Sequence, residues 1–154
     1  MASTLATSTV YTGTRPSTAW WVGASLTALV VAFLVFDAAV KFTANSAVVS
    51  AFAQLGYPLA LGPVIATLEI VCLVVYLVPR TSLLGALLWT GYLGGAIATH
   101  LRVGNPLFSH TLFPIYVAVL IWGGLVLRDA DLRVFLLRPV VKTDETRTHD
   151  RFRP

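Results

Sequence analysis

The sequence predicts an all-α integral membrane protein: a four-helix bundle whose N-terminus and C-terminus both face the cytoplasm. Composition is the first observation, because 56% of the 154 residues are hydrophobic and only 12% are charged, with a mean hydropathy of +0.79. A soluble domain carries about 45–50% apolar and about 25% charged residues. The second observation is that twelve of the eighteen charged residues lie in 128–154, which leaves six for residues 1–127. Such a chain has too little polar surface to coat a soluble globule.

Four long apolar stretches predict the four spans, at about residues 19–42, 59–78, 83–101 and 112–127. A spanning helix needs about 20 apolar residues. The fourth stretch has only 16, roughly 24 Å of helix, so Leu107 and Phe108 are expected to help it cross the hydrocarbon region. The connection 79–82 is very short and makes spans two and three antiparallel neighbours. Within 43–58, apolar residues at helical spacing predict a short helix lying in the membrane interface.

The predicted domain organisation is one membrane domain, residues 19–137, with a short segment on each side. Residues 1–18 are rich in Ser and Thr and are expected to be disordered, and residues 138–154 form a charged tail. Orientation follows from the Lys and Arg residues near the span ends. Nine lie on the side of the two termini and two on the other side. This imbalance predicts that the tail is cytoplasmic.

Charged side chains within the spans are costly, and each therefore needs a reason. Glu69 lies near the predicted midplane of span two, without a polar neighbour in sequence. The candidate cations lie near the outer end, about 13 Å away along a helix. We therefore expect a neutral Glu69, hydrogen-bonded to Tyr92 or Thr67. Asp37 and Lys41 are four residues apart on span one, where they form either a simple ion pair or part of a binding site.

The outer ends of spans three and four carry a second group of polar residues. His100 and Arg102 end span three, and His110 opens span four. A structural interpretation is available for each, since Arg102 can contact lipid phosphate and His110 can cap a helix. No two histidines are spaced by three or four residues, so any metal or haem would need ligands from separate helices, and no metal site is predicted.

Small residues predict where helices approach closely. Gly91 and Gly95 form a GxxxG pattern, which favours close packing between helices within the bundle, with dimerisation as the alternative. The adjacent pair Gly123 and Gly124 is a plausible facing surface on span four.

Several classes of function have no support in the sequence. Motifs for nucleotide phosphates, zinc proteases, serine hydrolases and covalent haem are missing. The single cysteine, Cys72, excludes dithiol chemistry by this chain alone. The basic residues are concentrated in the tail and give no indication of nucleic-acid binding.

Residues 83–129 strongly resemble the DoxX-like family of small four-helix bacterial membrane proteins, most specifically in the block GGAIATHLRVGNPLFSHTLFP. The resemblance extends over about 19–137 and includes the Asp37…Lys41 spacing, the QLGYP turn and the PRT turn. The family's polar residues fall on seven positions here: Asp37, Lys41, Glu69, His100, Arg102, Asn105 and His110.

The resemblance implies a redox-associated subunit of the bacterial cytoplasmic (inner) membrane, because family members are associated with thiosulfate:quinone oxidoreductase, a terminal oxidase and oxidative-stress complexes. It implies a quinone-like or other lipophilic ligand between the helices, membrane lipids as surroundings and a redox protein as a possible partner. No other cofactor is evident. Catalytic roles are assigned as a hypothesis to Glu69 and His100, and ligand binding to six residues: Asp37, Lys41, Tyr92, Arg102, Asn105 and His110.

Two other functions remain open at this stage. One is an isomerase-like enzyme in which the buried carboxyl of Glu69 moves a proton on a lipophilic substrate. The other is a membrane scaffold whose basic tail binds a cytoplasmic partner.

Overall fold

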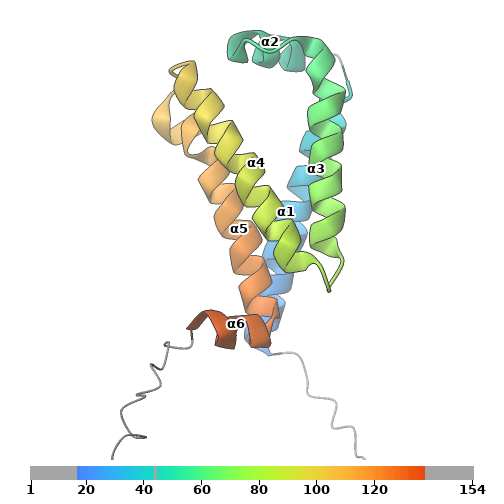
Figure 1. The fold of residues 1–154 in the computed structure, drawn as a ribbon, viewed down its shortest axis with the longest axis vertical. Coiled ribbons are helices and arrows are strands. Elements are labelled where there is room, and N and C mark those ends of the chain that lie inside the picture. The colour runs from blue at the N-terminus through green and yellow to red at the C-terminus, as the bar shows by residue number, and fades with distance from the viewer. Residues whose placement is uncertain (1–16, 44, 138–154) are drawn as a thin grey trace, which may run out of the picture.

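A computed structural model describes residues 17–43 and 45–137 of the chain, and within these ranges it contains helices and no strand (Figure 1). The elements in order are α1 (Thr18–Lys41), α2 (Ser46–Leu55), the 3₁₀ helix η1 (Leu59–Leu61), α3 (Gly62–Leu77), α4 (Ser82–Arg102), the π-helical turn η2 (Leu107–Thr111), α5 (Phe113–Arg128) and α6 (Ala130–Leu137). The all-helical fold class is confirmed. The expectations for 1–16 and 138–154 concern residues outside the described ranges.

Four of the described helical segments are long and apolar enough to cross a membrane: Thr18–Lys41, Leu59–Leu77, Ser82–Arg102 and Leu107–Arg128. The predicted number of spans is confirmed. The fourth segment begins at Leu107 rather than near residue 112, because the π-helical turn extends α5. Pro114 explains the change of helix type, since it has no N–H to donate to the carbonyl of His110 and an α-helix cannot continue through it unbroken.

Local sequence accounts for the helix ends. Ser17 caps α1 by accepting a hydrogen bond from the Trp20 backbone N–H, at 3.2 Å. Asn45 caps α2 in the same way through the Val48 N–H, at 2.9 Å. The chain leaves α2 at Gly56, whose φ of 70° is left-handed and therefore suits glycine. The short helix expected within residues 43–58 is thus present as α2.

The four long helices form a ring in which α1 contacts α3, α3 contacts α4, α4 contacts α5, and α5 contacts α1. Tyr76, Trp89 and Ile121 are among the largest side chains buried between them. The start of α1 and the helix α6 lie at one end of this bundle, while α2 lies at the other end (Figure 1). An even number of spans places both ends of the described chain on the same side.

The helices approach one another most closely at the end that carries Thr18. A Cβ atom added at Gly85 of α4 would lie 2.3 Å from the Tyr76 Cα of α3. A Cβ on Gly124 of α5 would lie 2.5 Å from the Thr27 hydroxyl of α1, and one on Gly23 would lie 2.8 Å from Leu127 Cβ. The close packing predicted for Gly124 is therefore present. From this narrow end, α3 and α4 diverge toward α2 (Figure 1).

The predicted role of Gly91 and Gly95 in close helix packing within the bundle is wrong. A Cβ at either position would have no atom within 4 Å among the neighbouring described groups. Both residues lie on the half of α4 that has already diverged from α3. The GxxxG spacing places two glycines on one face, but helix packing uses that face only where a partner helix is near it.

The glycine contacts predict opposite effects for the same substitution at two positions of α4. Gly85→Ala should destabilise the bundle by about 1–3 kcal/mol, because the added methyl group overlaps the Tyr76 backbone. Gly94→Ala should be neutral or stabilising by up to about 1 kcal/mol, since its Cβ meets open space and alanine favours the helix. Thermal unfolding of the purified protein in detergent measures both, and similar midpoints for the two variants would contradict the packing described.

Labelling of single cysteines tests the predicted orientation. Ser50 of α2 and Ala130 of α6 are exposed and lie toward opposite ends of the bundle. In a Cys72→Ala background, an impermeant thiol reagent added to intact cells should label Ser50→Cys and not Ala130→Cys. Permeabilised cells provide the control, because both cysteines should then react. The reverse pattern in intact cells would mean that both termini face outward.

Candidate ligand-binding site

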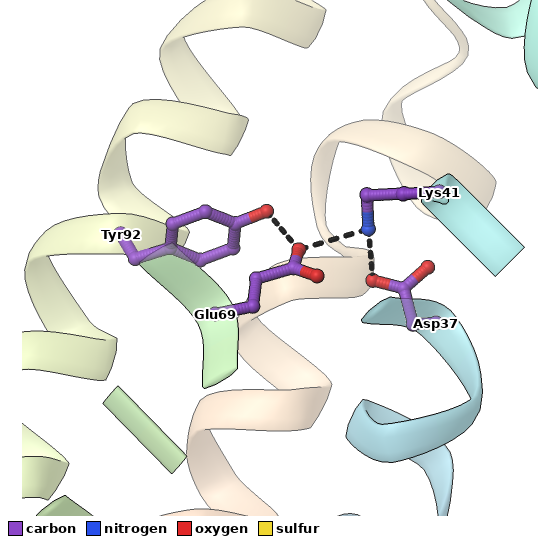
Figure 2. Close-up of polar contacts among 4 residues, drawn as sticks. All are labelled: Asp37, Lys41, Glu69 and Tyr92. Carbon is purple, nitrogen blue, oxygen red and sulfur yellow. Dashed lines mark hydrogen bonds and ion pairs between the residues drawn. The ribbon is translucent and has the colours of Figure 1, made fainter. Parts of the chain in front are cut away.

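A cluster of four polar side chains lies inside the bundle and joins α1, α3 and α4 (Figure 2). Glu69, at the middle of α3, is only 1% exposed. Its Oε1 atom accepts a hydrogen bond from Lys41 Nζ at 2.8 Å and another from the Tyr92 hydroxyl. Lys41 Nζ also donates to the Asp37 carboxylate one turn earlier on α1. The ammonium group therefore bridges two carboxylates from different helices.

The Tyr92 partner of Glu69 agrees with the sequence prediction, but two other expectations for Glu69 are wrong. The Thr67 hydroxyl donates to the Pro63 carbonyl instead. A cation also reaches Glu69, although the helix rise had suggested that none could. The end of α1 lies beside the start of α3, where a Cβ on Gly62 would be 3.0 Å from the Lys41 carbonyl oxygen. Helix rise counts only the Cα positions, whereas the long side chains of Lys41 and Glu69 bring Nζ to 2.8 Å from Oε1.

A cavity of about 480 Å³ lies where the helices diverge. Its lining is mainly apolar and aromatic and includes side chains from α1, α2, α3, α4 and α5. Its polar wall consists of Asp37, Lys41, Tyr57, Tyr92, Thr99 and His100. Glu69 is not part of the lining and lies behind Lys41 and Tyr92. Four of the eight predicted site residues therefore reach the cavity wall: Asp37, Lys41, Tyr92 and His100.

Helix α2 and the segment after it cover the wide end of the cavity. Phe52 and Leu55 of α2 contribute to the lining. The Tyr57 hydroxyl is hydrogen-bonded to the Thr99 hydroxyl at 2.9 Å. Because Thr99 belongs to α4, this bond ties the cover to the far side of the cavity.

Arg102 and Asn105 hold this cover in place and do not line the cavity. The Arg102 guanidinium donates to the Leu55 carbonyl at the end of α2, at 2.6 Å, and lies 5.7 Å from the centre of the Tyr57 ring. Asn105 accepts a hydrogen bond from Gln54 at 3.2 Å. The predicted ligand-binding roles of these two residues have no support in their contacts, which are structural.

The two histidines lie next to each other, with ring centres 5.9 Å apart, but have different partners. His100 Nδ1 is 2.8 Å from Asn105 Nδ2, whereas His110 Nδ1 is 2.8 Å from the Ser109 hydroxyl. Because an amide nitrogen only donates, His100 Nδ1 accepts and its Nε2 carries the proton. Only His100 lines the cavity. Within the described ranges, His, Cys, Asp and Glu side chains form no group of three that could hold a metal ion.

Sequence reasoning missed the aromatic part of the site. Trp89 and Tyr57 line the cavity together with Phe33, Phe52 and Phe113. Trp89 packs edge-on against Tyr92, with ring centres 5.3 Å apart. Trp89 lies three residues before Tyr92, which places both on one face of α4. This spacing is visible in the sequence and could have indicated Trp89 as a site residue. The phenylalanines come from three other segments, and no local pattern connects them.

The model of the DoxX-like family matches residues 25–124, which is more than half of the chain. The chain belongs to the DoxX-like family. The matched region of this DoxX-like protein includes most of α1, all of α2, α3 and α4, and most of α5, and it contains every candidate site residue. The resemblance inferred from the sequence is thereby confirmed. No curated protein and no solved structure matches the chain.

The ion cluster predicts unequal effects for its members. Lys41→Met leaves Asp37 and the buried Glu69 without their cation, so it should cost about 3–5 kcal/mol of unfolding free energy. Glu69→Gln should cost clearly less, because the amide oxygen can still accept from Lys41 and Tyr92 while Asp37 neutralises the ammonium group.

Thermal unfolding of the two single variants and the double variant in detergent measures the coupling between these residues. The double variant should be more stable than Lys41→Met alone, because one unpaired carboxylate has been removed. A double variant with purely additive losses would contradict the assignment of Lys41 as the shared cation.

Proposed function

We propose that this DoxX-like protein binds a quinone-like ligand between its helices, as a redox-associated subunit of the bacterial cytoplasmic membrane. The observation that carries the proposal is the mainly apolar cavity with a charged and hydrogen-bonding wall at one side. Pockets for small molecules and cofactors typically measure about 300–1,000 Å³ and combine apolar walls with a few oriented polar groups. The cavity of about 480 Å³ fits this description. Family membership supports the redox association.

The polar wall offers donors suited to the two carbonyl oxygens of a quinone. An ammonium group has three N–H donors, and two of those of Lys41 are directed to Asp37 and Glu69. The third has no acceptor among the described residues. His100 supplies a second donor, because its Nδ1 atom is the acceptor from Asn105 and its Nε2 atom carries the proton.

Two buried polar atoms near the cavity also lack partners in the described part of the chain: the acceptor Glu69 Oε2 and the donor Trp89 Nε1. Buried polar groups in folded proteins are rarely left unpaired. Trp89 lines the cavity, so a carbonyl oxygen of the head group would supply an acceptor for its Nε1, whereas Glu69 Oε2 lies behind the wall and would need a donor such as water. In this arrangement Glu69 is a positioning residue, since its carboxylate holds both Lys41 and Tyr92.

The isomerase-like alternative has less support. General acid–base chemistry requires the carboxyl group to reach the reacting atom of the substrate. Glu69 is behind the cavity wall, and one of its oxygens is already held by Lys41 and Tyr92. The scaffold alternative depends on residues 138–154, which lie outside the described ranges.

Quinone binding to the purified full-length protein in lipid nanodiscs tests the proposal. A short-tailed quinone should quench tryptophan fluorescence, because Trp89 lines the cavity. Ala96→Phe should weaken binding by more than about tenfold, since the ring fills space that the ligand needs. Ala98→Phe is the matched control, because Ala98 is exposed two residues later and does not line the cavity.

Equal binding to both variants would overturn the proposed site. Lack of binding to the wild-type protein, together with no quinone extracted from the purified membrane protein, would overturn the proposed function.

A further inference from the structure

The cavity wall between α3 and α4 consists of residues that also lie on the outer surface of the bundle. On α4, Gly91 and Gly95 line the cavity and are exposed. On α3, Leu68 lines the cavity and is 51% exposed. The same residues therefore face both the interior and the surroundings of the bundle, which means that the cavity is open on this side. Because α3 and α4 both belong to membrane-spanning segments, the opening faces hydrocarbon.

Two tyrosine hydrogen bonds border this opening, one at each end. Tyr92 of α4 donates to Glu69 of α3 on the side of the narrow end, whereas Tyr57, in the segment between α2 and η1, bonds Thr99 of α4 on the side of α2. Gly95 lies between Tyr92 and Thr99 on α4. The separation of seven residues between Tyr92 and Thr99 corresponds to about 10 Å of helix. Carbon atoms in contact are about 4 Å apart, so a single hydrocarbon chain can pass between the two bonds.

On two other sides of the cavity, side chains from neighbouring helices contact each other. Between α1 and α5, Phe33 and Phe113 pack edge to face, with ring centres 5.5 Å apart. Between α4 and α5, the Trp122 indole donates to the Thr90 hydroxyl at 3.0 Å. In contrast, a Cβ on Gly95 in the opening, or on Gly91 just beyond the Tyr92 bond, would meet nothing within 4 Å. The missing side chains leave a passage that ordinary residues would fill.

We propose that the ligand is a tailed membrane lipid that enters between α3 and α4, and that its hydrocarbon tail remains in this opening beside Gly95. The head group then lies inside the cavity, next to Lys41 and Tyr92, while the tail extends into the bilayer. This inference rests on the proposed function, because it assigns a tail site to the same cavity. It specifies the ligand as a polar head on a long isoprenoid or acyl chain.

Substitution of adjacent glycines on α4 tests the tail site separately from the head site. Gly95→Leu places a side chain in the opening, and its Cβ has the space to be accommodated without disturbing the fold. Gly94→Leu is the matched control, because Gly94 is also exposed with nothing within 4 Å but does not line the cavity. Two probes are compared by tryptophan quenching in nanodiscs: a quinone head group without a tail, and the same head group with a long isoprenoid tail.

Gly95→Leu should weaken binding of the tailed quinone by about tenfold or more, since the leucine and the tail compete for one space. The tail-less quinone should bind Gly95→Leu within about twofold of wild type. Gly94→Leu should bind both probes as the wild-type protein does.

Each other outcome has a distinct meaning. If Gly95→Leu leaves tailed-quinone binding unchanged, or weakens both probes equally, the tail site is wrong while the binding cavity stands. If neither probe binds the wild-type protein, the proposed function itself fails.

Discussion

Close approach of the helix backbones at one end of the bundle is the constraint on which the rest of the structure depends. Glycines on α1, α4 and α5 remove the side chains that would separate the helices there, and neighbouring atoms occupy the space. Helices in contact at one end and tilted relative to each other must separate toward the other end. Where residues with larger side chains do not fill that separation, a cavity remains. The cavity of about 480 Å³ and the covering helix α2 both lie beyond this point of divergence.

The charged cluster is tolerated within a membrane span because its single cation is paired with both acidic side chains. A single ionised side chain at the centre of a bilayer costs about 2.5–3.5 kcal/mol on the insertion scale. Here one ammonium group lies between two carboxylates, and a tyrosine hydroxyl adds a further donor to the most buried of them. The cluster also joins three helices at the height where they begin to separate. It therefore fixes the polar wall of the cavity as well as the spacing of the helices around it.

The site combines parts that have different physical roles. Lys41, Tyr92 and His100 present polar atoms to the cavity, whereas Glu69 and Asn105 orient those side chains from behind. The aromatic rings around Trp89 supply apolar contact area with limited conformational freedom. Helix α2 covers the wide end, and the glycine side of α4 leaves an opening toward hydrocarbon. This arrangement fits the proposed ligand, which has a polar head and enters from the membrane.

The sequence by itself determined the all-helical class, the four apolar helices long enough to span a membrane, the short helix α2 and the residues that carry buried charge, because hydropathy and helical periodicity are local properties. It also indicated the Tyr92–Glu69 contact. It did not determine that Lys41 reaches Glu69, that Arg102 holds α2, or that Gly91 and Gly95 border a cavity rather than a helix contact. The rise per residue gives only the position of each Cα atom along its own helix axis. The tilt of each helix, its rotation and the reach of its side chains are set by packing against the other helices, and those were decided by the tertiary structure.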